Sequence, residues 1–304
     1  MSDTTTQEPQ AGGPAAEAEA KPERTFLQWI AHELVETGLT IAVFVPFWLL
    51  FSTFVYELRS IPSESMVPAL QVGDRVAVAK FTYGYNINSI PFSVGTMIFG
   101  NDPKKPDEGI WVRTPHRGDV IVFQHPHNPR VMIKRCVGLP GDTVQVAGGR
   151  LYVNGQLIER TRVRETTYIP DDGTHPVTAT EYREQLPGEK QPHLIHEFSD
   201  NADLDQTPIF KVPAGHVFMM GDNRDNSEDS RAPTGHRSMA AQFPEAWPLR
   251  GVNLGGDPKD DAIGFVPLDH LIGRAETVLF TLHGCKKAPG TECPEPRLWK
   301  GLQK

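Results

Sequence analysis

The sequence has little cysteine and no excess of basic residues. Its 304 residues include three cysteines and carry a formal net charge of -8. A nucleic-acid-binding surface needs clustered lysine and arginine without matching acids, so the charge balance argues against a nucleic-acid partner. Cys136, Cys285 and Cys293 do not have the spacing of a metal site. A short-loop disulfide between Cys285 and Cys293 and a pair of unpaired thiols both fit their spacing.

Long helix-favouring stretches are also scarce. The chain contains 27 glycines and 27 prolines, which interrupt helices, so the composition favours a β-rich fold with many turns. Apolar runs between turn residues predict strands at 75–81, 119–123, 131–137, 217–220 and 277–282.

One stretch predicts a β-meander. Residues 143–158 alternate between apolar and polar side chains, with two glycine-containing tight turns. Long polar segments interrupt the strand pattern elsewhere, and we expect them to be loops or insertions near 95–117, 160–210 and 232–262.

A single long uncharged run lies near the N-terminus. Residues 1–24 have almost no large apolar side chains and are expected to be disordered. Residues 37–56 contain no charge, and as a helix they would span about 30 Å, the thickness of a bilayer's hydrocarbon core. A buried core helix would show a polar face, and a cleavable signal peptide would have a shorter apolar region. We therefore predict an uncleaved membrane anchor over 37–56, whose orientation is not decided by counting flanking basic residues.

Two serines follow this run, in a segment flanked by prolines. Pro62 and Pro68 hold the segment extended or turned. Residues i and i+2 of an extended chain face the same way, so the hydroxyls of Ser63 and Ser65 could enter one site. On its own, a Ser-x-Ser sequence between prolines is more often a surface turn.

A lysine interrupts the apolar run 131–137. A lysine in a strand usually points to solvent, but an inward-facing one is desolvated, which lowers its pKa. A neutral amine can act as a general base toward a serine hydroxyl. Lys134 is therefore a candidate base.

The acidic segment 221–231 resembles a calcium-binding loop only superficially. Counted from Asp222, Arg224 takes a ligand position, Ser227 stands where glycine is needed, and Pro233 replaces the closing glutamate. The alternative is a network in which the acids and arginines of the segment compensate one another. We expect no metal there.

Together these blocks resemble the bacterial type I signal peptidases, or leader peptidases, a family of serine proteases with a Ser/Lys dyad. The matching motifs are IPSESMVPAL at 61–70, VGDRVAVAKF at 72–81, KRCVGLPGD at 134–142, GDNRDNSEDSR at 221–231, GFVP at 264–267 and IGRA at 272–275. The resemblance implies a mainly β fold with antiparallel sheets, joined to one N-terminal transmembrane helix. It divides the chain into a cytoplasmic segment 1–36, the anchor, a catalytic β domain over 57–282 and a C-terminal tail over 283–304.

The resemblance also implies a role for each matched residue. Ser65 would be the nucleophile and Lys134 the general base. Ser63 and the Ser65 backbone N–H would stabilise the oxyanion, and Ser227 would orient Lys134. Supporting residues would be Asp229 and Arg231. The shallow apolar pockets for small substrate side chains would be shaped by Ile61, Pro62, Met66, Leu70 and Ile133.

The implied partners are the signal peptides of secreted preproteins and membrane lipid, with no cofactor, no metal and no nucleic acid. The implied location is the bacterial plasma membrane, crossed once, with a cytoplasmic N-terminus. The long segments listed above depart from compact family members and put the geometry around the substrate cleft in doubt.

Two other classes of function compete with this interpretation. His116, His125 and His127 could form a zinc site, although no carboxylate or cysteine has a convincing spacing to them. A Ser/His pair, as in eukaryotic-type relatives, is disfavoured because lysine stands at the position of the base. A non-catalytic homologue that binds exported proteins would be expected to lack Ser65 or Lys134, and both are present.

Overall fold

The structure is a computed structural model that describes residues 25–85, 111–128, 130–170, 173, 175–232, 263–282 and 288–302. It divides into two compact units, Met1–Phe47 and Trp48–Lys304. The predicted disorder of 1–24 and most of the segments 95–117 and 232–262 lie outside the described residues.

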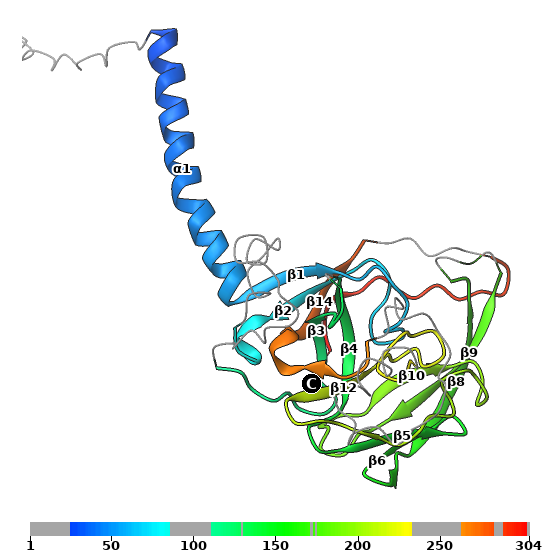
Figure 1. Cartoon of the computed structure of the whole chain (residues 1–304). Coiled ribbons are helices and arrows are strands. Elements are labelled where there is room, and N and C mark those ends of the chain that lie inside the picture. The colour runs from blue at the N-terminus through cyan, green and yellow to red at the C-terminus, as the bar shows by residue number, and fades with distance from the viewer. Residues whose placement is uncertain are drawn as a thin grey trace, which may run out of the picture. The chain divides into compact units, whose positions relative to one another are not determined.

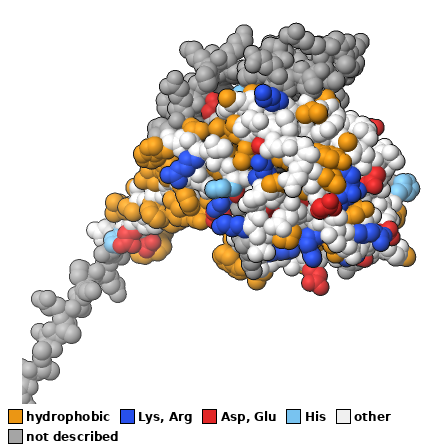
Figure 2. All heavy atoms as spheres, turned by 90° about the horizontal axis from the view of Figure 1, so that it is seen from below, with side chains coloured by type: hydrophobic (Ala, Val, Ile, Leu, Met, Phe, Trp, Pro, Cys, Tyr) orange, Lys and Arg blue, Asp and Glu red, His pale blue; other side chains and the backbone are white. Residues whose placement is uncertain are grey.

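One long helix, α1, covers Phe26–Phe54 and contains Pro46. It begins eleven residues before the predicted span and ends two before its end. Its large apolar side chains are exposed, for example Phe44 at 62% and Val43 at 72%, and Figure 2 shows hydrophobic side chains gathered along it. By length and composition this helix could cross a membrane, as the uncharged run predicts.

Among the described residues, the second unit consists of the end of α1, antiparallel strands (Figure 1) and short 3-10 helices. The strands are β1 Tyr56–Ser60, β2 Asp74–Ala79, β3 Val120–Gln124, β4 Val131–Gly138, β5 Thr143–Ala147, β6 Arg150–Val153, β7 Gln156–Leu157, β8 Arg160–Tyr168, β9 Val177–Glu184, β10 His193–Glu197, β11 Phe210–Lys211, β12 His216–Met220, β13 Val266–Pro267, β14 Leu271–Thr281 and β15 Leu298–Gly301. The 3-10 helices are η1 Lys80–Thr82 and η5 Leu268–His270. The predicted mainly β fold is therefore confirmed.

The largest sheet has the strand order β1-β2-β14-β3-β4-β12-β13, and β15 pairs with β14. Every residue of β3 is buried, as expected for a continuous apolar strand in the middle of a sheet. In the register of β3 and β4, Ile121 lies opposite Lys134. The sheet thus places Lys134 on an interior strand, next to fully buried apolar side chains.

The predicted meander forms β5, β6 and β7, which with β11 make a four-stranded sheet. Its apolar side chains pack with those of β12 in one core cluster that includes Val144, Leu151, Phe210 and Phe218. The apolar and polar residues in 143–158 therefore alternate because the sheet has one buried face.

Two segments differ from the expectations. The prediction of loops over 160–210 is wrong for much of that range, because β8, β9 and β10 form a three-stranded sheet there. Five consecutive residues of β8 are exposed, so the strand lacks the apolar alternation that would have identified it. The predicted tail also contributes a strand, β15, to the largest sheet.

The structure shows the bonding state of two of the three cysteines. Cys136 is free and fully buried in β4. Cys293 is disulfide-bonded, which excludes an unpaired thiol at that position. Cys285 lies outside the described residues.

Candidate active site

Ser65 lies in the turn segment that follows β1. Two apolar neighbours in this segment, Met66 and Leu70, have no exposed surface and belong to one core cluster, together with Ile61 at 3% exposure. The Met66 carbonyl accepts a hydrogen bond from Leu70 N at 2.8 Å, and the Ser65 carbonyl accepts one from Asn223 N at 3.2 Å. Buried anchors on both sides therefore fix the position of the Ser65 side chain, which is 8% exposed.

A C-terminal arginine fixes the end of the same turn. Arg297 donates from Nη1 to the Ala69 carbonyl at 2.6 Å and from Nη2 to the Pro68 carbonyl at 2.7 Å. It also pairs with Asp74 of β2 at 3.1 Å. The described end of the chain thus supports the segment that carries Ser65. The sequence motifs did not indicate this contact.

Lys134 reaches Ser65 from β4. Its side chain is 3% exposed, and Nζ lies 2.6 Å from Ser65 Oγ, a normal hydrogen-bond length. The two residues are 69 positions apart in the sequence and meet because Ile133 of β4 packs against the apolar side chains of the turn. The other fully buried lysine in the described residues, Lys80, is instead ion-paired with Glu57.

Burial lowers the pKa of Lys134 from 10.5 to about 8. The carboxylates of Asp229, Glu228 and Asp222 oppose this shift, and the guanidinium of Arg231 adds to it. An amine with this pKa is partly neutral near pH 7 and can accept a proton from a neighbouring hydroxyl.

The second serine of the segment is close to the first. Ser63 Oγ lies 3.4 Å from Ser65 Oγ, and Ser63 is exposed. Its hydroxyl can therefore donate to a group bound at Ser65 without moving a buried side chain.

Ser227 lies on the loop after β12 and is 7% exposed. Within the described part of the chain its Oγ has no hydrogen-bond partner, so the predicted bond to Lys134 is not formed in this structure. A Cβ added at Gly221 would lie 2.1 Å from Ser227 Oγ and 2.5 Å from the Ser65 carbonyl oxygen. Gly221 is thus a site residue. It belongs to the motif at 221–231, but the motif alone did not indicate its role.

Asp229 and Arg231 form a buried ion pair on the same loop. Arg231 donates from Nε and Nη2 to the two carboxylate oxygens of Asp229, both at 2.9 Å. Gly221 N donates to Asp229 Oδ2 at 2.9 Å, which joins the pair to the start of the loop. Burial alone would raise the pKa of Asp229, but Arg231 and these hydrogen bonds hold it below its usual range.

A second buried ion pair connects the loop to β4. Arg135 donates to both carboxylate oxygens of Asp222, at 2.7 and 2.6 Å, and to the Gly118 carbonyl at 2.7 Å. Arg135 directly follows Lys134 in the sequence. This bidentate pair therefore fixes the loop against the strand that carries Lys134.

A cleft of about 420 Å³ opens over the two central residues. We call it the serine cleft; it is lined by Pro62, Ser63, Glu64, Ser65, Val72, Arg130, Val131, Met132, Ile133, Lys134, Asn226 and Glu228. Two of the predicted pocket residues, Pro62 and Ile133, line it. The other three, Ile61, Met66 and Leu70, are buried in the core cluster against which Ile133 packs.

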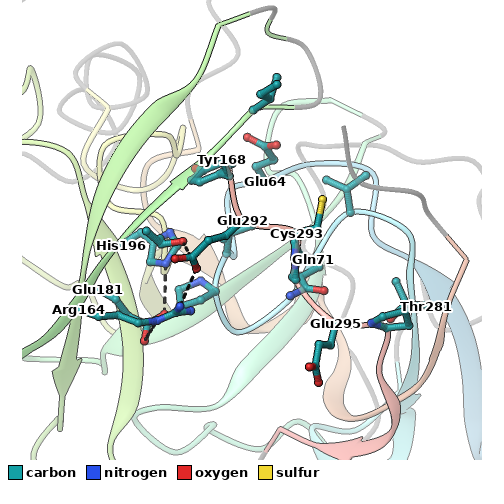
Figure 3. A pocket seen from close by; sticks show the side chains of 17 residues that line it. Glu64, Gln71, Arg164, Tyr168, Glu181, His196, Thr281, Glu292, Cys293 and Glu295 are labelled. Carbon is teal, nitrogen blue, oxygen red and sulfur yellow. Dashed lines mark hydrogen bonds and ion pairs between the residues drawn. The ribbon is translucent and has the colours of Figure 1, made fainter. Parts of the chain in front are cut away.

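A second pocket, of about 300 Å³, shares Glu64 and Val72 with the serine cleft. Figure 3 shows Arg164 between the carboxylates of Glu181 and Glu292, with interactions at 3.4 and 2.7 Å. Neither Ser65 nor Lys134 lines this pocket. It therefore lies beside the candidate active site and is not part of it.

The candidate zinc histidines are not arranged around an ion. His116 is exposed, and His125 Nδ1 accepts a hydrogen bond from His127 N at 3.1 Å. Only one group of side chains in the described residues could hold a metal ion, and it consists of Glu197, Asp205 and Asp225.

Comparisons with known proteins identify the class. The family model described as signal peptidase, peptidase S26 matches residues 33–280. The signal peptidase I of Pseudomonas aeruginosa is 36% identical over 264 residues, which cover 85% of this chain and 77% of that protein. The signal peptidase I of Rickettsia typhi is 31% identical over 239 residues, which cover 77% of this chain and 75% of that protein. The crystal structure of a signal peptidase I from Enterococcus faecalis matches with 22% identity and a TM-score of 0.26, over 53% of this chain and 97% of that one.

These matches define a hydrolase of the serine protease class. The chain belongs to the signal peptidase, peptidase S26 family. The resemblance seen in the sequence motifs is thereby confirmed.

Proposed function

We propose that the chain is a membrane-bound endopeptidase that removes signal peptides from exported preproteins, with Ser65 as nucleophile and Lys134 as general base. The observation that carries this proposal is the 2.6 Å distance between Lys134 Nζ and Ser65 Oγ at a site where both side chains are buried. Membership of the family supports the same reaction.

The reaction begins with proton transfer from Ser65 to the neutral amine of Lys134. Ser65 Oγ forms a bond to the carbonyl carbon of the scissile peptide, and the electron pair of the C=O bond moves to the oxygen. Hydrogen bonds from Ser63 Oγ and the Ser65 backbone N–H would stabilise this oxyanion. The position of Ser63 Oγ, 3.4 Å from Ser65 Oγ, supports this assignment.

Collapse of the oxyanion breaks the peptide C–N bond. The ammonium of Lys134 returns its proton to the leaving nitrogen, which departs as the new N-terminus of the mature protein. A water molecule then gives a proton to Lys134 and attacks the acyl carbon, and Ser65 recovers its proton as the signal peptide is released. Ser227, which lacks a hydrogen-bond partner among the described residues, would orient the amine once the cleft is occupied.

The shape of the serine cleft supports an extended peptide substrate. The segment Pro62–Ser65 and the first residues of β4, Val131–Ile133, both line it. Among the described strands, β12 pairs with β4 at Arg135, Cys136 and Gly138 but not further toward Val131. A peptide lying along residues 131–134 would therefore gain main-chain hydrogen bonds and place alternate side chains in the cleft. We propose that the small side chains of an Ala-x-Ala site fit there, against Pro62 and Ile133.

The anchor places the enzyme where its substrates are. Helix α1 is long and apolar enough to span a bilayer once, in contact with membrane lipid. We propose that the N-terminus lies in the cytoplasm and the β domain outside the plasma membrane, as the resemblance to the family implies. Tethering both enzyme and preprotein to one membrane raises their effective concentration.

The test uses the full chain in detergent and a preprotein with an Ala-x-Ala site. We expect Ser65→Ala and Lys134→Ala to lose cleavage by at least about 10³-fold, because members of a catalytic unit are not independent. Lys211→Ala, which changes an exposed lysine of β11, is the control and should cleave like the wild type. Cleavage by Ser65→Ala at near-normal rates would refute the mechanism, and binding without cleavage by the wild type would favour a non-catalytic homologue.

A further inference from the structure

Three carboxylates converge outside the serine cleft. Glu197 is the last residue of β10, Asp205 lies in the turn that follows, and Asp225 belongs to the loop after β12. One oxygen from each lies within 4.8 Å of an oxygen from each of the others. The residues are 8 and 20 positions apart, so the fold and not a local motif brings them together.

Two of the three carboxylates are buried, Asp225 is half-buried, and the cluster is incompletely paired. Glu197 is 3% exposed and Asp205 is 1% exposed. In the described part of the chain, Glu197 Oε2 and Asp225 Oδ1 have no hydrogen-bond partner. A buried carboxylate oxygen without a partner is unfavourable by several kcal/mol in an apolar setting, so two in one cluster point to a missing cation or proton.

The nearby arginines do not fill this role. Arg160 lies 2.8 Å from Glu197 Oε1, but it also pairs with Asp200 and donates to the Gly149 carbonyl. Arg224, whose charge also acts on Glu197, donates to the carboxylate of Glu184 at 3.1 Å. Among the described residues the three carboxylates therefore share one directly paired arginine, Arg160, which Asp200 also engages.

We propose that Glu197, Asp205 and Asp225 bind a divalent cation of the calcium class. The donors are all oxygens, which are the ligands of calcium and magnesium and not of zinc or copper. Calcium tolerates irregular coordination by oxygens from separate elements, whereas magnesium demands near-ideal octahedral geometry and keeps most of its water, so three converging carboxylates suit calcium better. Water would complete the coordination.

A cation here would act on the loop that carries the site residues. Asp225 Oδ2 accepts hydrogen bonds from Phe198 N at 2.6 Å and Ser199 N at 3.0 Å, so Asp225 already joins the loop to the end of β10. Asp225 precedes Ser227 by two residues. A cation bridging Asp225 to Glu197 would hold this part of the loop in place, which makes the three acids positioning residues.

The direct test is binding of calcium to the full chain in detergent after removal of metal by a chelator. We expect isothermal titration calorimetry to give one site, with a Kd on the order of 10⁻⁴–10⁻³ M for so few protein ligands. Calcium at ten times its Kd should raise the thermal midpoint by roughly 3–6 °C. Magnesium should bind at least about tenfold more weakly, because it demands near-ideal octahedral geometry and gives up its water reluctantly.

Variants separate this site from adventitious binding. Glu197→Gln and Asp205→Asn should each weaken calcium binding at least about tenfold, while Asp203→Asn, an exposed aspartate of the same turn, should bind like the wild type. Calcium should also accelerate cleavage by the wild type and not by Glu197→Gln. Absence of a calorimetric signal from the wild type at 10-millimolar calcium (about ten times the expected Kd) would overturn the proposal and leave a proton on Glu197 as the explanation. Binding is measured without substrate, so this outcome is independent of the proposed peptidase reaction.

Discussion

Replacing Lys134 by methionine should stabilise the protein at neutral pH while abolishing cleavage. Methionine has an unbranched apolar chain and can occupy the buried space without a charge to desolvate. The native lysine has a pKa of about 8 against an ordinary value of 10.5, and this difference corresponds to about 3 kcal/mol of unfavourable free energy at low pH.

The sign follows from proton uptake. Between pH 8 and 10.5 the unfolded chain holds a proton on Lys134 that the folded chain has released, so the stability of the wild type rises with pH through this range. Methionine does not titrate. The stability advantage of the Lys134→Met protein should therefore shrink by about 2 kcal/mol between pH 7 and pH 9.5.

The assay is guanidinium unfolding of the full chain in non-ionic detergent, followed by near-UV circular dichroism at the two pH values. Other titrating groups, including Lys80, are common to both proteins and cancel in the difference. Lys211→Met replaces an exposed lysine and should show a difference from wild type that does not change with pH. If the difference for Lys134→Met is equally constant, the amine is not desolvated and the argument for a neutral base fails.

Further predictions concern the loop around the site. The rate of cleavage should rise with pH through about 8, as the amine of Lys134 loses its proton. Glu228→Gln removes a carboxylate that raises the pKa of Lys134, so this variant should show the same rise at a pH lower by less than one unit. A pH–rate profile unchanged from that of the wild type would contradict this. Gly221→Ala should reduce cleavage at least about tenfold, since its Cβ would lie 2.1 Å from Ser227 Oγ, whereas Gly38→Ala, with nothing within 4 Å, should leave cleavage unchanged. Asp222→Asn should lower the free energy of unfolding by about 3 kcal/mol in denaturant titration, because it weakens the partner of a buried arginine; a loss below about 1 kcal/mol would show that the pair is not needed.

The sequence predicted those parts of the fold that have a repeating apolar signal. The uncharged run gave the helix, and the alternation over 143–158 gave β5 to β7. The strand β8 could not be found in this way, because five of its residues are exposed arginine, threonine, valine and glutamate. Its pairing with β9 rests on backbone hydrogen bonds and cross-strand contacts, which local composition does not report.

The site shows the same division. Residue type and family motif pointed to Ser65 and Lys134, but their 2.6 Å separation depends on the register of β4 and on the buried anchors of the turn. The carboxylate cluster gave no signal in the sequence, because its members are not at ligand spacing. A calcium loop takes its ligands from one contiguous segment, which 221–231 does not provide. The proposed site uses only Asp225 from that segment.

One loop connects stability, chemistry and the proposed cation. Gly221 makes room for Ser227 beside the Ser65 backbone, and Asp222 fixes the start of the loop to Arg135 of β4. The carboxylates of this loop raise the pKa of Lys134 while burial lowers it, so the value of about 8 is a balance that the loop's position sets. A displacement that carried the carboxylates away would lower the pKa of Lys134 and would also move Ser227 away from the Ser65 backbone. Under the proposed mechanism, cleavage near neutral pH would therefore depend on a rigid loop rather than on burial alone, and the proposed cation at Asp225 would supply part of that rigidity.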